Sequence, residues 1–122
     1  MQLNGRSEGL IPDSGKFLDA WKKGISVAGE HFFRCEDIHS IEKATDKDQL
    51  RPNWKAIKEG LRELSPGEAV FLIAMYSYFN AYKGQELFKM SGLDCTPCHV
   101  FAHIDLERRV IIAQLGVHYC GW

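Results

Sequence analysis

The longest apolar stretch of the chain lies within residues 65–83, SPGEAVFLIAMYSYFNAYK. After its glutamate, only Ser77 and Asn80 are clearly polar before the closing lysine. A helix that is apolar on all sides needs cover on nearly all sides. The stretch is also too short and too interrupted to cross a membrane, which takes about 20 apolar residues. The pattern therefore predicts a central buried helix over about residues 66–83.

Both ends of this helix carry residues that typically begin or end helices. Ser65 can accept a hydrogen bond from a backbone N–H of the first turn, and Pro66 lacks an N–H that would otherwise be unpaired. Glu68 can reach back to the cap. Gly84 is expected to end or kink the helix.

Apolar residues at helical spacing predict two amphipathic helices before the central one. The first begins at Ser14, as its cap, and runs to about Ala28. Its apolar stripe is Phe17, Leu18, Trp21 and Ile25. The second is opened by Pro52, and its stripe, at spacings of three, four and three, is Trp54, Ile57, Leu61 and Leu64. The charged residues expected to face solvent are Lys55, Lys58, Glu59, Arg62 and Glu63.

The segment between these two helices, residues 30–45, fits two conformations. Its apolar residues Phe32, Phe33, Ile38 and Ile41 can form one helical face, and a helix is the conformation that we favour. Residues 31–35 also fit an extended segment.

The sequence after Gly84 predicts short helices. QELFKM fits a turn of helix that stops at Ser91-Gly92, and Thr96-Pro97 is a second cap-plus-proline start. From there one helix can run to about Tyr119, or Asp105 can cap a separate final helix. One face of this last segment is formed by Leu106, Val110, Ala113 and Val117, with Ile111, Leu115 and His118 beside it.

These patterns predict an all-α fold, a compact single-domain bundle of five or six helices around the helix at about 66–83. No segment alternates polar and apolar residues long enough to predict a strand. We expect residues 1–13 to be a flexible N-terminal arm and residues 14–122 to be one helical domain. At 122 residues, the chain is long enough to bury a core without disulfides.

Charge and composition argue against several classes of partner. The net charge is −1 and no basic stripe stands out, so we expect no nucleic-acid binding. No membrane association is expected either. Residues 1–13 lack the apolar core of a secretory signal, so we expect a cytoplasmic protein whose four cysteines are thiols, metal ligands or redox groups.

One cluster could carry chemistry, the segment Cys95-Thr96-Pro97-Cys98-His99. It matches C-x-x-C-H, the attachment pattern of c-type haem, in which His99 would bind the iron. The candidates for the opposite ligand are His103, His118, Met75 and Met90. Because covalent haem attachment takes place outside the cytoplasm, we do not expect haem here.

Two further interpretations of this cluster involve thiolate or metal chemistry. C-x-P-C at a helix start resembles the active-site tetrad of thioredoxin-like oxidoreductases, and the resemblance implies a thiol with a lowered pKa at Cys95. It covers four residues and does not extend to the fold, because no hydrophobic strand precedes it. As a metal site, Cys95, Cys98, His99 and His103 offer the sulfur and nitrogen ligands that zinc prefers, and iron is the other candidate. A mixed site in a bundle could add Glu36, His39 and Glu107.

No glycine-rich phosphate loop or nucleophile elbow is present, so we do not expect an enzyme. Free cysteines are often buried as small apolar residues, and Thr96-Pro97 can serve only to start a helix. The sequence therefore favours an interaction or assembly module, binding a protein partner or a second copy of itself. The alternative is a metal-binding or thiol-redox protein that uses the 95–103 segment, and without it we expect no cofactor.

Overall fold

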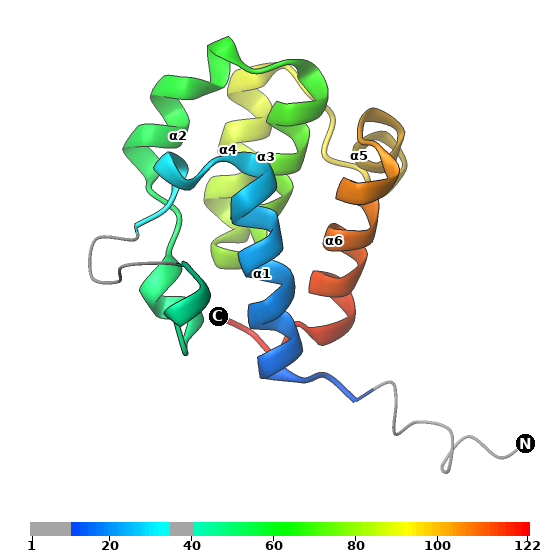
Figure 1. Ribbon diagram of the computed structural model, residues 1–122. Helices are drawn as coiled ribbons and strands as arrows, with labels where there is room; N and C mark the ends of the chain where they lie inside the picture. Colours follow the sequence, from blue (N-terminus) through cyan, green and yellow to red (C-terminus); the bar gives the residue numbers. More distant parts are fainter. Residues whose placement is uncertain (1–10, 35–40) are drawn as a thin grey trace, which may run out of the picture.

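The computed structural model of the protein describes residues 11–34 and 41–122 and confirms the all-α prediction (Figure 1). The α-helices are α1 (Ser14–Ala28), α2 (Trp54–Gly60), α3 (Pro66–Phe79), α4 (Ala81–Ser91), α5 (Pro97–His103) and α6 (Leu106–His118). Short 3-10 turns are η2 (Glu30–Phe32), η3 (Ile41–Lys43), η4 (Lys47–Leu50) and η5 (Leu61–Glu63). In these two ranges, no helix has the length and apolar character that spanning a membrane requires.

Helix α3 is the central helix, as predicted, and it contacts α1, α4, α5 and α6. Ser65 Oγ accepts a hydrogen bond of 3.2 Å from the Glu68 backbone, and Glu68 Oε1 accepts one of 2.9 Å from the Ser65 backbone. This reciprocal capping box is the one that the sequence predicts. The buried residues of α3 come from all sides of the helix: Ala69, Val70, Phe71, Leu72, Ile73, Met75 and Tyr76.

The predicted end of the central helix was wrong. Helix α3 ends at Phe79, and Asn80 adopts an extended conformation (φ −152°, ψ 103°) from which α4 begins. The Asn80 side chain accepts a hydrogen bond of 3.1 Å from the Lys83 backbone, so it caps α4. Gly84 lies buried inside α4, where an added Cβ would be 3.0 Å from Ser77 Cα. This glycine therefore permits the close approach of α4 to α3 and ends neither helix.

Helix α1 matches its predicted range and packs along α6 (Figure 1). Its cap is Asp13, one residue before the predicted Ser14, because the Asp13 carboxylate accepts a hydrogen bond of 2.9 Å from the Lys16 backbone. The fully buried indole of Trp21 donates a hydrogen bond of 2.9 Å to the Leu50 carbonyl. This bond joins α1 to η4.

The helix predicted for residues 30–45 was wrong in the part that the structure describes. Gly29, with φ +123°, ends α1, and the described parts of this segment form only the short 3-10 turns η2 and η3. Phe33 forms an isolated antiparallel bridge with Pro52, so Pro52 does not open the next helix. Asn53 caps α2 instead, since its side chain accepts a hydrogen bond from the Ala56 backbone. Glu36, Ile38 and His39 lie outside the described residues.

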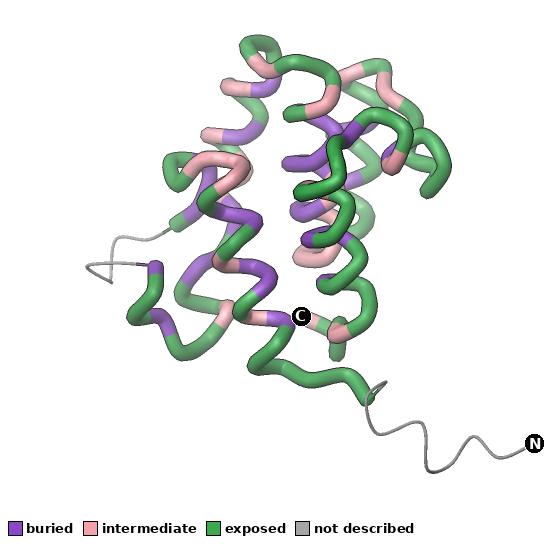
Figure 2. Tube along the Cα trace, turned by 45° about the vertical axis from the view of Figure 1, so that its right-hand side comes forward, coloured by how far each residue is buried: buried purple, intermediate pink, exposed green. Residues whose placement is uncertain are grey.

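Two separate helices form the C-terminal part, with Asp105 capping α6 by accepting a hydrogen bond of 3.0 Å from the Arg108 backbone. Ile111, Ile112 and Leu115 of α6 are buried. The predicted apolar face next to them points outward: Leu106, Val110 and Val117 are 74%, 46% and 49% exposed. Figure 2 shows how buried and exposed residues alternate along the helices. Helix α6 is thus apolar on an inner and an outer side.

Candidate functional site

The 94–99 segment is ordered by short-range contacts around the start of α5. Thr96 precedes Pro97 at the helix start, as predicted, but its hydroxyl does not cap the helix. The hydroxyl lies 2.8 Å from His99 Nδ1, and the Asp94 carboxylate lies 3.4 Å from the same nitrogen. The hydrogen bond from the Thr96 backbone N–H holds the pKa of Asp94 below its usual value.

The structure does not bring the four predicted metal ligands together. His103 Nδ1 lies 2.7 Å from the His99 carbonyl, so this ring nitrogen is occupied by the backbone. Cys95 and Cys98 are exposed free thiols. Within residues 11–34 and 41–122, no group of three or more histidine, cysteine or acidic side chains is placed to hold a metal ion. A metal site at 95–103 remains a prediction from sequence.

Cys95 borders a small apolar hollow of about 280 Å³, together with Phe88, Val100, Phe101 and Ile112. Of the other candidate haem ligands, Met75 is fully buried in the core. Ser77 and Tyr78 also line the hollow, whose walls are otherwise mainly apolar. The polar side chains of Asp94, Thr96, His99 and His103 are exposed to solvent.

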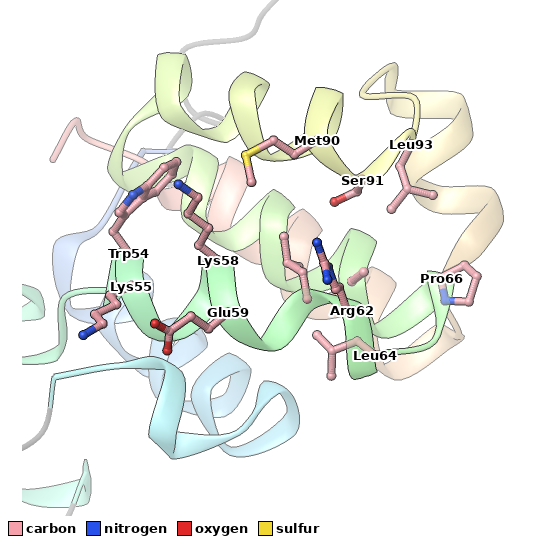
Figure 3. A pocket seen from close by; sticks show the side chains of 12 residues that line it. Trp54, Lys55, Lys58, Glu59, Arg62, Leu64, Pro66, Met90, Ser91 and Leu93 are labelled. Carbon is pink, nitrogen blue, oxygen red and sulfur yellow. The ribbon is translucent and has the colours of Figure 1, made fainter.

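A larger groove of about 910 Å³ lies between α2 with η5 on one side and the end of α4 on the other (Figure 3). It is lined by Trp54, Lys55, Lys58, Glu59, Leu61, Arg62, Leu64, Pro66, Ala69, Met90, Ser91 and Leu93. We refer to these residues as the α2–α4 groove. Buried Ala69 of α3 and Leu61 of η5 lie at its base, so the apolar core is continuous with its floor.

The walls of the α2–α4 groove are apolar and partly open to water. Leu64 and Leu93 are half-buried, and Met90 on the α4 side is 53% exposed. Trp54 forms one end, where its ring contacts Tyr76 at 5.7 Å between centroids and lies under the Lys83 ammonium at 4.4 Å. Thioether side chains are common at surfaces that bind partners because they are flexible and polarisable.

The charged rim of the groove is mainly basic. Lys55, Lys58 and Arg62 are exposed, and Glu59 is the acidic residue among the lining side chains. Lys58 and Arg62 point across the opening toward α4 (Figure 3). Neither of these two side chains forms an ion pair with another described residue. The rim is therefore free to pair with negative charge from outside.

Sequence reasoning missed this groove although it found half of the residues. It assigned Trp54, Leu61 and Leu64 to one apolar stripe and placed the lysines and Arg62 in solvent, and both assignments agree with the structure. The other wall could not be predicted, because a central helix running to residue 83 would carry Met90 away from α2. The available signal was Asn80, a residue type that favours helix starts.

No protein-family model, curated protein or solved structure matches this chain.

Proposed function

We propose that the protein is a small helical interaction module that binds a segment of a partner protein in the α2–α4 groove. The observation that carries the proposal is an apolar floor, continuous with the core, that stays open between two helices and is edged by unpaired cations. Sites for small molecules usually enclose most of the ligand surface. A groove open along one side instead suits a protein segment that keeps its own outer face in water.

Site-specific photo-crosslinking tests this proposal in the full chain. A photoreactive amino acid replaces Met90 in the groove, and in a matched control it replaces Tyr82, which is 85% exposed and does not line the groove. Cells producing each variant are irradiated and the adducts are identified by mass spectrometry. The identified partner is then purified, and its affinity is measured by calorimetry.

The expected result is one protein that crosslinks at position 90 and not at position 82. Its purified form should bind wild type, and Met90→Asp should weaken binding at least about tenfold, the equivalent of about 1.4 kcal/mol. Tyr82→Asp should leave the affinity unchanged. Adducts that are the same at both positions, or a partner indifferent to Met90→Asp, would overturn the proposal.

A second candidate function, self-association through α6, is favoured by the exposed apolar face of that helix. Leu106, Val110, Ala113 and Val117 follow spacings of four, three and four, which is the seam of a two-helix contact. Antiparallel pairing of two copies about a two-fold axis would place Leu106 opposite Val117 and Val110 opposite Ala113. The positive dipole end of one α6 would then lie beside the negative dipole end of the other, an arrangement that favours antiparallel pairing.

Sedimentation velocity tests this second function. Wild type should sediment as a dimer at tens of micromolar, and Val110→Glu should shift it to a monomer, while Tyr82→Glu should not. A wild type that is monomeric throughout this range would eliminate self-association and leave the groove proposal intact.

A further inference from the structure

Resting on the proposed function, the geometry points to the chemical class of the partner: we infer that the α2–α4 groove binds an amphipathic helix whose polar face is acidic. The inference uses two independent properties of the groove, its shape and its charge.

The shape of the groove suits a helix. Its walls are themselves helical, α2 with η5 on one side and α4 on the other, and side chains on such walls leave ridges and grooves into which a third helix can pack. A volume of about 910 Å³ corresponds to roughly two turns of a helix about 10 Å across. Two turns present three or four apolar side chains at i, i+3, i+4 and i+7. The floor and walls of the groove offer apolar contacts of the same extent through Leu61, Leu64, Met90 and Leu93.

The charge of the groove selects an acidic partner. Three cationic side chains and one carboxylate line it, and the Lys83 ammonium over Trp54 adds a further cation at one end. An amphipathic helix in the groove turns the flanks of its polar face toward Lys58 and Arg62. Glutamates on those flanks would form ion pairs at the edge of the contact, and lysines there would meet like charge. Glu59 and, near Tyr76, Glu86 oppose this effect, but they are outnumbered.

Two synthetic peptides test the inference on the full chain. Both have about 18 residues, or five turns, with the same leucine stripe at i, i+3, i+4 and i+7. One carries glutamate and alanine on its polar face, and the other carries lysine and alanine. Affinity is measured by calorimetry at low and at high salt, and dodecanoate is titrated as a probe for an anionic amphiphile.

Variants of the protein locate the binding. Lys58→Glu combined with Arg62→Glu reverses the rim, and Met90→Asp disrupts the apolar wall. Lys16→Glu combined with Lys43→Glu changes the net charge equally at exposed lysines that do not line the groove. Thermal melts confirm that each variant is folded.

The expected result is one-to-one binding of the acidic peptide, at least about tenfold tighter than the basic peptide, with the difference shrinking at high salt. Reversing the charge of the rim should abolish the preference for the acidic peptide, and Met90→Asp should weaken binding of the acidic peptide. The Lys16/Lys43 control should bind both peptides with the wild-type affinities. Equal affinity for the two peptides, or a preference that survives rim reversal, would overturn the inference. A protein that binds dodecanoate but neither peptide would also overturn the inference.

The crosslinking experiment separates this inference from the proposed function. A protein captured at Met90, with no affinity for the acidic peptide, would keep the groove as an interaction site and remove the acidic helix. Failure of both experiments would remove both.

Discussion

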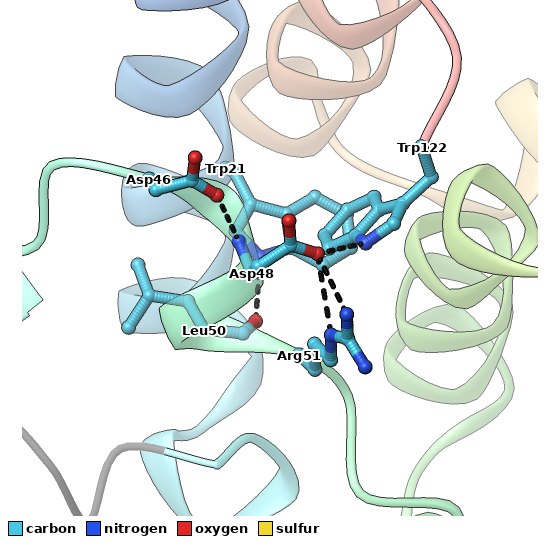
Figure 4. A network of polar contacts seen from close by, with 6 residues as sticks. All are labelled: Trp21, Asp46, Asp48, Leu50, Arg51 and Trp122. Carbon is cyan, nitrogen blue, oxygen red and sulfur yellow. Dashed lines mark hydrogen bonds and ion pairs between the residues drawn. The ribbon is translucent and has the colours of Figure 1, made fainter.

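Trp122 Nε1 donates a hydrogen bond of 3.0 Å to the carboxylate of Asp48, 74 residues earlier in the chain (Figure 4). The same carboxylate accepts hydrogen bonds from Arg51 Nε at 3.2 Å and from an Arg51 terminal nitrogen at 3.1 Å. Partial burial raises the pKa of Asp48, but the hydrogen bonds from Arg51 and Trp122 outweigh it and the net pKa is lowered. The indole also packs edge-on against Trp21, with ring centroids 4.8 Å apart. Through these contacts, Trp122 packs residues 119–122 against η4 and α1.

Replacing Trp122 tests how strongly this contact stabilises the fold. Trp122→Phe keeps an aromatic ring but loses the donor, so the free energy of unfolding should fall by about 1 kcal/mol. Trp122→Ala also loses the ring contacts of a half-buried indole and should cost about 2–3 kcal/mol. Urea denaturation measures both. A Trp122→Ala variant as stable as wild type would show that this contact does not form in solution.

Asn80 should be more important for stability than an ordinary polar surface residue. Its side chain accepts the hydrogen bond that caps α4, so Asn80→Ala should lower the free energy of unfolding by about 1 kcal/mol. Asn80→Asp retains an acceptor and should stay within about 0.5 kcal/mol of wild type. Equal loss in both variants would mean that the side-chain cap is not the cause.

Gly84 should tolerate no side chain. The Cβ of Gly84→Ala would clash with Ser77 Oγ and lie 3.0 Å from Ser77 Cα, so the α3 and α4 backbones would have to separate. We expect a loss of about 1–3 kcal/mol in the free energy of unfolding. Gly24→Ala is the comparison, because its Cβ would meet side-chain atoms of Met75 and Ile111 and no backbone atom. Circular-dichroism melts of the two variants should rank Gly84→Ala as less stable.

Carboxylates that accept backbone hydrogen bonds predict a loss of stability in acid. Backbone hydrogen bonds lower the pKa values of Asp13, Glu68, Asp94 and Asp105 in the folded protein. In the unfolded chain the pKa values of these groups are about 3.9 for aspartate and about 4.3 for glutamate. At a pH near these pKa values the unfolded state therefore binds more protons than the folded state. The stabilisation of the fold by these carboxylates is complete above the unfolded-state pKa values and is lost as the pH falls through the lowered folded-state pKa values. Thermal melts across this range should show the decline, and it should be shallower in Asp105→Asn, whose neutral side chain can still cap.

Cys95→Ser should leave metal content and stability unchanged. Cys95, Cys98, His99 and His103 do not converge, and Cys95 is exposed, so the free energy of unfolding should shift by less than about 0.5 kcal/mol. Mass spectrometry of protein purified without chelator measures metal per chain. Near-stoichiometric zinc or iron that disappears in the variant would contradict this expectation and establish the metal site.

The sequence predicts those parts of the fold whose signals are local. The Ser65–Glu68 capping box and the stripe of α1 depend on neighbouring residues, and the structure confirms both. The end of α3 depends on a competition between the capping preference of Asn80 and the apolar residues on either side, and apolar periodicity alone misses it. In α6 two adjacent sides are apolar, so only packing against α1 and α3 decides that Ile111 is buried and Val110 is not. The α2–α4 groove joins residues from two such segments, so it could be recognised only after Asn80 was seen to separate α3 from α4.

The single-residue connection at Asn80 also affects local unfolding. Asn80 donates its backbone N–H to the Tyr76 carbonyl and accepts the Lys83 N–H with its side chain, so the last turn of α3 and the first turn of α4 share one residue. A longer loop could absorb the fraying of one helix without disturbing the other. Here no loop separates the two helices. We therefore expect the backbone amides on both sides of Asn80 to exchange with deuterium together, as one cooperative unit. The α4 wall of the groove should then be as rigid as the central helix α3.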